Sequence, residues 1–292
     1  MSKVVCIGEV LWDSLPHGMF LGGAPLNVAV NLRNLDVDTS IISAVGDDEL
    51  GEKTRSEIKK RGVETTHIQT NRYKTGLVEV ELTEKGIPSY VIHEHRAWDY
   101  IEATEDAKSV VNEADYVVFG SLGFRNADSA QSIKKLLVAT DATKILDVNF
   151  RKPFYTKPLI EELLGLADVL KVNDEEIEEM ADWFGLDADY KSAIPKLCAM
   201  YGIEKAIITL GEEGSSLYVD GEFAHHPRFD VKVKDTVGAG DAFLSGVIFS
   251  MIQNKSPEET LQFANAMGAF VAGSEGATPV LNLSKIEGFI NK

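Results

Sequence analysis

The run KDTVGAGDAF at residues 234–243 combines groups that could bind an anion and remove a proton. A Gly-Ala-Gly turn stands directly before Asp241, and an apolar run at 242–249 follows it. Glycines let the backbone approach a charged group, and the free N–H groups at a helix N-terminus attract anions. We therefore expect an anion pocket with a base beside it. The alternative is that Asp241 only caps the helix.

Two further segments carry groups suited to a polyhydroxylated ligand. The run GGAPLN begins with Gly22 and Gly23 and ends at Asn27, with Asp13 upstream. Its proline favours a helix start, so the run could also be no more than a loop and a cap. Backbone glycines with an Asp and an Asn nearby can bind vicinal hydroxyls. Arg96 follows a predicted strand and is either a ligand contact or a surface residue.

Polar residues also follow three apolar runs that we interpret as parallel strands. Ligands of open α/β sheets gather at the carboxyl ends of their strands, so these residues are candidates for a binding site. An acidic helix start is the alternative for the segment at 173–176. The candidates are Asn149 and Arg151 after the first run, Asn173 and Glu176 after the second, and Thr209, Gly211 and Gly214 after the third.

The elements that position these groups follow from the hydrophobic pattern. Strands are predicted at 4–8, 39–46, 116–119, 144–148, 169–172 and 205–210, and helices at 27–34, 49–61 and 261–272. Strand and helix alternate, which indicates an α/β fold with a central, mostly parallel sheet flanked by helices on both faces.

One region departs from this alternation. Residues 76–83 and 89–94 alternate apolar and polar side chains around a Gly/Pro turn at 84–88, which predicts a hairpin with one solvated face. Residues 9–15 could add a strand. We interpret these pieces, at approximately 9–18 and 74–97, as a small antiparallel lid on a single domain spanning 1–292.

Composition excludes several classes of protein. The 292 residues include 44% hydrophobic ones and carry a net charge of -17, which argues against a nucleic-acid or anionic-membrane partner. Positive potential for an anion must then be supplied locally. Cys6 and Cys198 are far apart in apolar runs, so buried free thiols are predicted. No signal peptide or membrane-length apolar run is apparent, and we expect a cytoplasmic protein.

The run Asp-Thr-x-Gly-Ala-Gly-Asp-Ala-Phe resembles the signature of the ribokinase-like carbohydrate kinases, the PfkB family. It is neither a Walker A loop nor a dinucleotide fingerprint. The resemblance extends from Gly22 to Ala277 and implies a ribokinase-like fold with ATP and Mg²⁺ as cofactors. In this family Asp241 would accept a proton from the sugar hydroxyl, while Gly238, Ala239 and Gly240 would stabilise the transferred phosphoryl group.

The resemblance also implies roles for the other candidates. It places the sugar against Asp13, Gly22, Gly23, Asn27, Arg96 and Asn149. It places ATP against Arg151, Asn173, Thr209, Gly211, Gly214 and Asn265, Mg²⁺ near Glu176 through water, and a possible K⁺ near Asp235.

The substrate and the assembly are implied less specifically. The Gly-Gly-Ala-Pro-x-Asn variant resembles that of fructokinases, which favours phosphorylation of fructose to fructose 6-phosphate. Alternatives are a 2-keto-3-deoxygluconate kinase, a ribokinase or a nucleoside kinase. A sugar-phosphate kinase would need more basic residues than Arg96. A non-catalytic sugar sensor is a further alternative. Lids of the family often pair, so a homodimer through the lid is expected.

Overall fold

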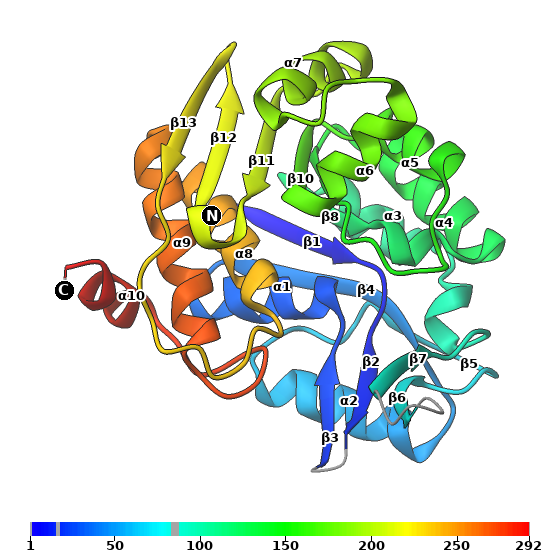
Figure 1. Ribbon diagram of the computed structural model, residues 1–292. Coiled ribbons are helices and arrows are strands. Elements are labelled where there is room, and N and C mark those ends of the chain that lie inside the picture. The colour runs from blue at the N-terminus through cyan, green and yellow to red at the C-terminus, as the bar shows by residue number, and fades with distance from the viewer. Residues whose placement is uncertain (1, 16–17, 83–87, 292) are drawn as a thin grey trace.

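A nine-stranded sheet forms the centre of the protein in the computed structural model, which describes residues 2–15, 18–82 and 88–291 (Figure 1). The strand order is β13-β12-β11-β10-β9-β8-β1-β4-β5, and only β12 and β13 at one edge run antiparallel to their neighbours. The strands are β1 (Lys3–Ile7), β4 (Asp38–Gly46), β5 (Ile68–Asn71), β8 (Tyr116–Gly120), β9 (Thr143–Asp147), β10 (Val169–Asn173), β11 (Lys205–Thr209), β12 (Ser215–Val219) and β13 (Glu222–His226).

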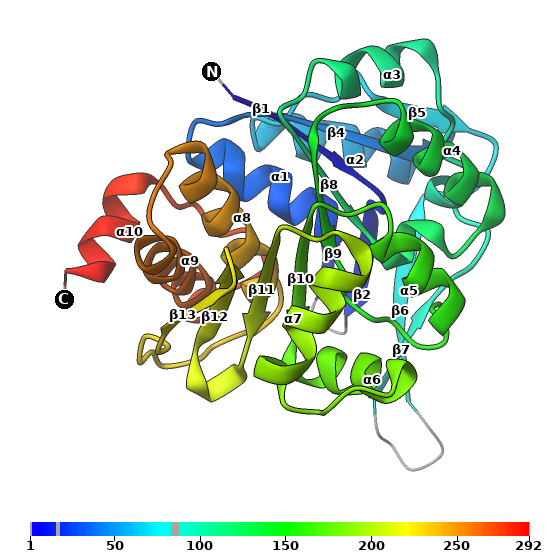
Figure 2. The ribbon, with the colours of Figure 1, turned by 90° about the horizontal axis from the view of Figure 1, so that it is seen from above.

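Helices cover both faces of this sheet, which confirms the predicted mostly parallel α/β architecture (Figure 2). One layer contains α1 (Ala24–Asn34), α2 (Glu49–Lys60), α8 (Ala239–Ile252), α9 (Pro257–Ala272) and α10 (Leu283–Ile290). The other contains α3 (Glu105–Asn112), α4 (Ala127–Val138), α5 (Lys157–Leu164), α6 (Asp174–Phe184) and α7 (Tyr190–Tyr201), with the short helices η1 (Ala97–Tyr100) and η2 (Ser121–Phe124). A third short helix, η3 (Gly211–Glu213), follows β11.

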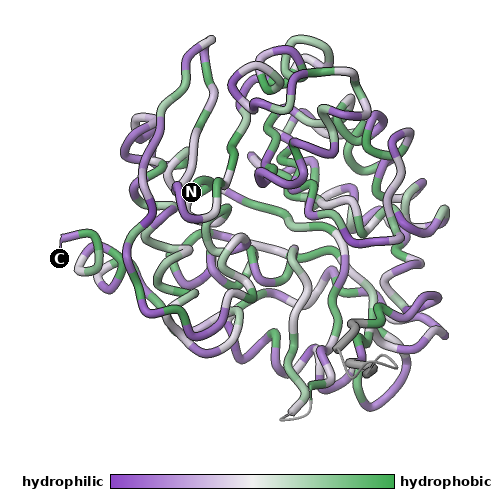
Figure 3. The backbone as a smooth tube through the Cα atoms, viewed as in Figure 1, coloured by the Kyte–Doolittle hydropathy of each residue, from purple (hydrophilic) through white to green (hydrophobic). Residues whose placement is uncertain are grey.

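The central strands are apolar on both faces because each face packs against a helical layer. In β1, Val4 and Cys6 join the core on one side, whereas Val5 and Ile7 join the core on the other. Hydrophobic residues accordingly run along the strands of the sheet in Figure 3. The predicted strands and helices lie within a few residues of their expected bounds, because this hydrophobic pattern is local in the sequence.

A second sheet of four strands forms the lid, in the order β3-β2-β6-β7. Its two outer pairings are antiparallel, and the central pairing of β2 with β6 is parallel. The indole Nε1 of Trp12 donates a hydrogen bond to Thr54 Oγ1 at 2.8 Å, which links the lid to α2. The strands are β2 (Leu11–Leu15), β3 (Gly18–Gly22), β6 (Gly76–Leu82) and β7 (Pro88–Ile92).

The sequence did not predict β3, because the run GMFLG lacks regular alternation. Most of the predicted 84–88 turn lies outside the described residues. Cys6 and Cys198 are buried and free, as predicted, and burial raises the pKa of both thiols. Among the described residues, no helix is long and apolar enough to cross a membrane.

Candidate active site

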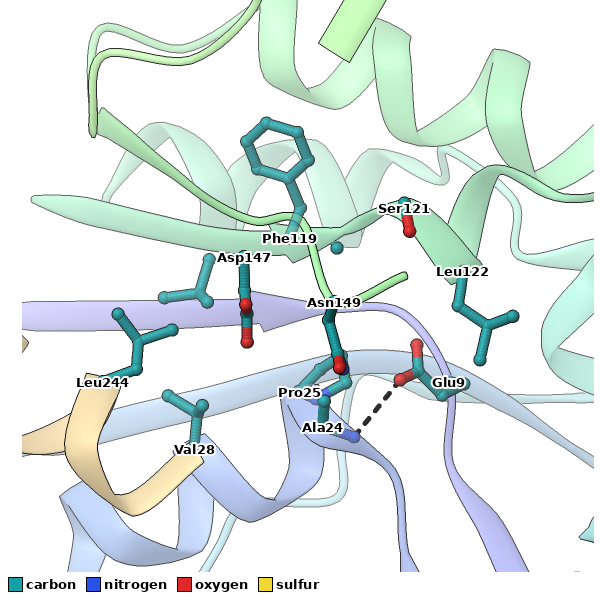
Figure 4. A pocket seen from close by; sticks show the side chains of 12 residues that line it. Glu9, Ala24, Pro25, Val28, Phe119, Ser121, Leu122, Asp147, Asn149 and Leu244 are labelled. Carbon is teal, nitrogen blue, oxygen red and sulfur yellow. Dashed lines mark hydrogen bonds between the residues drawn. The ribbon is translucent and has the colours of Figure 1, made fainter. Parts of the chain in front are cut away.

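The strand order reverses beside β1, and polar residues gather at this point. From β1 the chain continues to β4 on one side of it, and later to β8 on the other. Such a switch point opens a crevice outside the carboxyl ends of the strands. Figure 4 shows a pocket there with Glu9, Ala24, Ser121, Asp147 and Asn149 in its lining. Of the predicted site residues, Asn149 is in this lining, together with Ala24, which directly follows Gly23.

The first turn of α8 contains the glycines and the aspartate of the predicted anion pocket. Gly238, the N-cap, has φ 77°, and a Cβ there would stand 2.6 Å from Ala277 Cβ, so the fold itself requires this glycine. Gly240 has no positive φ, and a Cβ placed on it would stand 3.7 Å from Lys171 Nζ, the one contact within 4 Å that the described residues make there apart from its chain neighbours and its own helix backbone. Space beside Gly240 therefore remains open for a ligand to approach the N–H groups of this turn.

Asp241 lies on this same turn and is held by α1. Asn27 Nδ2 donates a hydrogen bond to Asp241 Oδ2 at 2.8 Å, which leaves Oδ1 free of this contact. Burial, reinforced by the charge of Asp147, raises the pKa of Asp241 to about 6, although the Asn27 hydrogen bond and Lys171 oppose the shift. A carboxylate with such a pKa is ionised at neutral pH and is a better proton acceptor than an ordinary aspartate.

The Gly22-Gly23 turn brings carboxylates from β1 and the lid to the opposite side of the crevice. Gly23 has φ 115°, and a Cβ there would stand 2.4 Å from the carbonyl oxygen of Glu9. Ala24 N donates to Glu9 Oε1 at 3.2 Å, and burial raises the pKa of Glu9 to about 7. A Cβ on Gly22 would stand 3.0 Å from Asp13 Oδ2. Burial also raises the pKa of Asp13, to about 6.

The end of β9 contributes Asn149 and Arg151. Asn149 has φ 43° and lines the pocket, so the bend after the strand turns this residue toward the crevice. Arg151 is exposed, and its charge lowers the pKa of Glu9, Asp13 and Asp241 against the effect of burial. The guanidinium thus lies near the carboxylates of Glu9, Asp13 and Asp241. Its contact with ATP stays a prediction.

Asn173 and Glu176 form a capping box at the start of α6. Asn173 Oδ1 accepts from Glu176 N at 2.7 Å, and Glu176 Oε2 accepts from Asn173 N at 2.9 Å. Glu176 Oε1 accepts from Phe150 N at 2.9 Å, which ties the loop after β9 to α6. A carboxylate oxygen can accept a second hydrogen bond, so these oxygens suit water molecules around Mg²⁺ better than direct coordination.

Among the other residues predicted to bind ATP, Thr209 ends β11, Gly211 begins η3, Gly214 directly precedes β12, and Asn265 lies on α9. Thr209 Oγ1 donates to Val172 O at 3.5 Å, and Gly211 has φ 52°. Gly214 has φ 98°, and a Cβ there would stand 2.2 Å from His226 O, so the chain path requires this glycine. Asn265 Oδ1 accepts from Ser215 Oγ at 3.1 Å, and its Nδ2 donates to His226 O at 3.2 Å. These bonds give Asn265 a structural role, and the contact with ATP that the resemblance implies stays a prediction.

Comparison with known proteins identifies the family. The family model described as pfkB family carbohydrate kinase matches residues 17–283. The chain belongs to this family. A fructokinase of Rhizobium leguminosarum bv. trifolii is 28% identical over 85% of this chain and 79% of its own length. An ATP-dependent ribose-1-phosphate kinase of Halopiger xanaduensis is also 28% identical, over 100% of this chain and 99% of its own.

Solved structures of related kinases have the same fold. The structure of a fructokinase from Xylella fastidiosa with bound ATP has a TM-score of 0.88 at 25% identity, covering 99% of this chain and 98% of its own. A 2-dehydro-3-deoxygluconokinase from Thermotoga maritima also has a TM-score of 0.88, at 20% identity, covering 100% of this chain and 98% of its own. The predicted ribokinase-like fold is therefore confirmed, and the protein is a carbohydrate kinase.

The surroundings of Asp235 and Arg96 do not test the roles predicted for them, which are K⁺ binding and sugar binding. Asp235 Oδ1 accepts from Val237 N at 3.0 Å, and the described residues contain no cluster of three or more His, Cys, Asp or Glu side chains suited to a metal. Arg96 N donates to Asp99 Oδ2 at 2.9 Å, and Arg96 Nε is buried without a hydrogen-bond partner among the described residues.

The sequence candidates did not include four charged residues whose side chains are buried: Glu9, Asp147, Lys171 and Arg125. Lys171 and Asp147 form a buried ion pair at 2.9 Å. Arg125 binds Asp99 through Nε at 2.7 Å and Nη2 at 2.8 Å, and its guanidinium lies 3.9 Å from the Trp98 ring centroid. A lysine inside the apolar run VLKV was the available signal, since a buried charge requires a partner.

Proposed function

We propose that this kinase transfers the γ-phosphoryl group of ATP to a primary hydroxyl of a free sugar, with fructose as the substrate that its residues favour. One observation carries the proposal: a carboxylate with an elevated pKa lies at the open N-terminus of α8 and faces the sugar-side turn. Asp241 is fixed there by Asn27, with Oδ2 of the aspartate engaged at 2.8 Å. A protein that only bound the sugar would have no need of a carboxylate beside a phosphate.

The chemistry follows from this arrangement. The sugar hydroxyl oxygen forms a bond to the γ-phosphorus, the bond from that phosphorus to the oxygen bridging the β- and γ-phosphates breaks, and ADP leaves. Asp241 accepts the hydroxyl proton. The N–H groups of the Gly238-Ala239-Gly240 turn stabilise the negative charge of the phosphoryl group. Phosphoryl transfer depends mainly on positioning and charge stabilisation, and the rigid α1–α8 contact provides the positioning.

Two cations complete the proposed site. Asn173 and Glu176 would hold Mg²⁺ through water, and the ion would neutralise charge on the outer phosphates of ATP. Potassium near Asp235 is proposed as an activator. We expect EDTA to abolish turnover and excess Mg²⁺ to restore it, and we expect potassium buffers to support faster turnover than sodium buffers. Equal rates in the two buffers would remove the potassium site from the proposal.

The charges of the crevice favour a neutral acceptor. Glu9, Asp13 and Asp241 supply three carboxyl groups, and an anionic substituent on the sugar would be repelled by them. A second candidate is the sugar acid 2-keto-3-deoxygluconate. Arg96 Nε, which is buried without a hydrogen-bond partner in the part of the chain that the structure describes, favours it, because a guanidinium binds a carboxylate well.

A substrate panel tests the proposal. ADP release is measured through a coupled assay with fructose, ribose, 2-keto-3-deoxygluconate, ribose 1-phosphate and adenosine, and the product of the best acceptor is identified by ³¹P NMR. The proposal expects the highest kcat/KM with fructose and a phosphomonoester on a primary carbon. A higher kcat/KM with another acceptor would replace fructose. The absence of acceptor-dependent ADP release with every compound would refute the kinase activity.

We further propose a homodimer that forms through the lid in the cytoplasm. The strand β3 lies at one edge of the lid sheet, and its Met19 and Phe20 are exposed by 39% and 42%. Open sheet edges with apolar side chains favour association. Light scattering should give about twice the 32.0 kDa chain mass, and a value near the monomer mass would contradict the dimer.

A further inference from the structure

Lys171 is a buried cation in the middle of β10. The residue is 6% exposed, and its Nζ lies 2.9 Å from Oδ1 of Asp147, its cross-strand partner on β9. Buried lysines are rare in proteins because removing a charge from water is costly. A purely structural role in the ion pair with Asp147 would account for the burial of Lys171 only if the two charges balanced each other.

The surroundings of Lys171 contain more negative charge than one ion pair needs. Burial lowers the pKa of Lys171, but the charges of Asp147, Glu176 and Asp241 raise it above its ordinary value overall. The lysine is therefore protonated at any physiological pH. Three carboxyl groups thus act on one ammonium, so Lys171 supplies positive charge where carboxyl groups outnumber it.

The Lys171 ammonium lies beside the first turn of α8, where the anion pocket is predicted. Lys171 Nζ lies 3.7 Å from the place where a Cβ on Gly240 would stand, and apart from the neighbours of Gly240 in the chain and the backbone of α8, no other atom of the described residues lies within 4 Å of that place. Gly240 has no positive φ, so its backbone conformation does not require glycine. The open space beside Gly240 is thus bordered by the N–H groups of the first turn of α8 and by the Lys171 ammonium.

We propose that Lys171 is a further catalytic residue, whose Nζ donates a hydrogen bond to the phosphoryl group during its transfer. This inference rests on the proposed function. The lysine remains protonated throughout, so it exchanges no proton and only stabilises charge, while Asp241 accepts the proton of the sugar. In a protein with a net charge of -17, a buried ammonium supplies the positive potential that the overall composition lacks.

The test compares Lys171→Met with a matched control. Lys144→Met removes the lysine of the Lys144–Asp168 ion pair, also at 2.9 Å, at the opposite end of the same two strands. We expect Lys171→Met to lower kcat by about 10²–10³-fold with a similar KM for the sugar, and Lys171→Arg to restore part of the loss. We expect Lys144→Met to keep kcat within about twofold, because surface pairs contribute little.

A binding measurement separates catalysis from structure. Calorimetry with ADP alone and with ADP plus aluminium fluoride and sugar compares the ground state with a mimic of the transferring phosphoryl group. The proposal expects Lys171→Met to bind ADP normally and to lose the additional affinity produced by aluminium fluoride. Normal kcat, or normal affinity for the mimic, in folded Lys171→Met protein would overturn the proposal.

A second variant keeps the test decisive if Lys171→Met does not fold. Lys171→Met combined with Asp147→Leu removes both charges of the pair, and such replacements are often tolerated in a core. This variant must also bind ADP and fail to bind the mimic, and tight binding of the mimic would refute the role of Lys171. Wild-type protein that releases no ADP with any acceptor would instead refute the proposed function, and this inference with it.

Discussion

Replacing Asp241 with asparagine should make the protein almost inactive and, at the same time, more stable. The variant keeps the shape of the side chain and an oxygen that can accept from Asn27 Nδ2. A positioned base contributes about 10²–10⁴-fold to the rate, so kcat should fall by that factor. Burial and Asp147 raise the pKa of Asp241 from an ordinary 3.8 to about 6, so ionising this carboxyl costs folding free energy. At about 1.4 kcal/mol per pH unit, the cost is at most about 3 kcal/mol.

The stability gain should depend on pH with a definite sign. The folded protein binds the Asp241 proton more tightly than the unfolded chain, so ionisation removes stability as pH rises from about 4 to about 6. Above that window the full cost applies to the wild type and is absent from Asp241→Asn. Because the side chain is partly exposed, we expect a gain of about 1–3 kcal/mol at pH 7.5 and a smaller gain at pH 4.5.

Urea unfolding followed by circular dichroism at the two pH values measures this gain, and the coupled assay measures kcat. Asp168→Asn is the control, because Asp168 pairs with Lys144 at the amino end of the sheet and should affect stability without affecting turnover. A variant that loses turnover but is no more stable at pH 7.5 than the wild type would refute the reasoning about burial. Near-normal turnover of Asp241→Asn would refute its role as the base.

Three other predictions follow from the same geometry. Since the pKa of Asp241 is raised to about 6, kcat/KM should fall about tenfold from pH 7 to pH 5, and a flat profile over that range would argue against an aspartate base. Gly240→Ala should unfold at the wild-type temperature but lose about 10–100-fold in kcat. Gly238→Ala should instead lower the unfolding temperature, because Gly238 has φ 77° and its new Cβ would stand 2.6 Å from Ala277 Cβ. Equal behaviour of the two variants would contradict our separation of their roles. Gly246→Ala should destabilise the protein by about 1–3 kcal/mol in urea unfolding, because its Cβ would stand 2.7 Å from Ala264 Cα, and an unchanged midpoint would contradict that packing argument.

The sequence alone predicted much of the fold and the centre of the site. Apolar runs of four to eight residues and helix-start signals are local properties, so the strands and helices of the large sheet could be located from them. The Gly-Ala-Gly-Asp run likewise predicted the helix start at α8, because glycine spacing and the following apolar helix are also local, while the anion pocket at that start stays a prediction. The strand β3 escaped prediction because its pairing with β2, rather than its own pattern, makes it a strand.

Contacts between distant segments were determined only by the tertiary structure. Asp241 meets Asn27 across 214 residues, and nothing in either segment specifies that hydrogen bond. Arg125 reaches both the end of the lid and Asp99, which joins the lid to the core. The sequence thus determined which residue types were available for phosphoryl transfer. The parallel strand order brought Lys171 of β10 beside Asp147 of β9, and the carboxylates around Lys171 raise its pKa although burial lowers it. Both effects arise only when the chain is packed, because they depend on neighbours that are remote in the sequence.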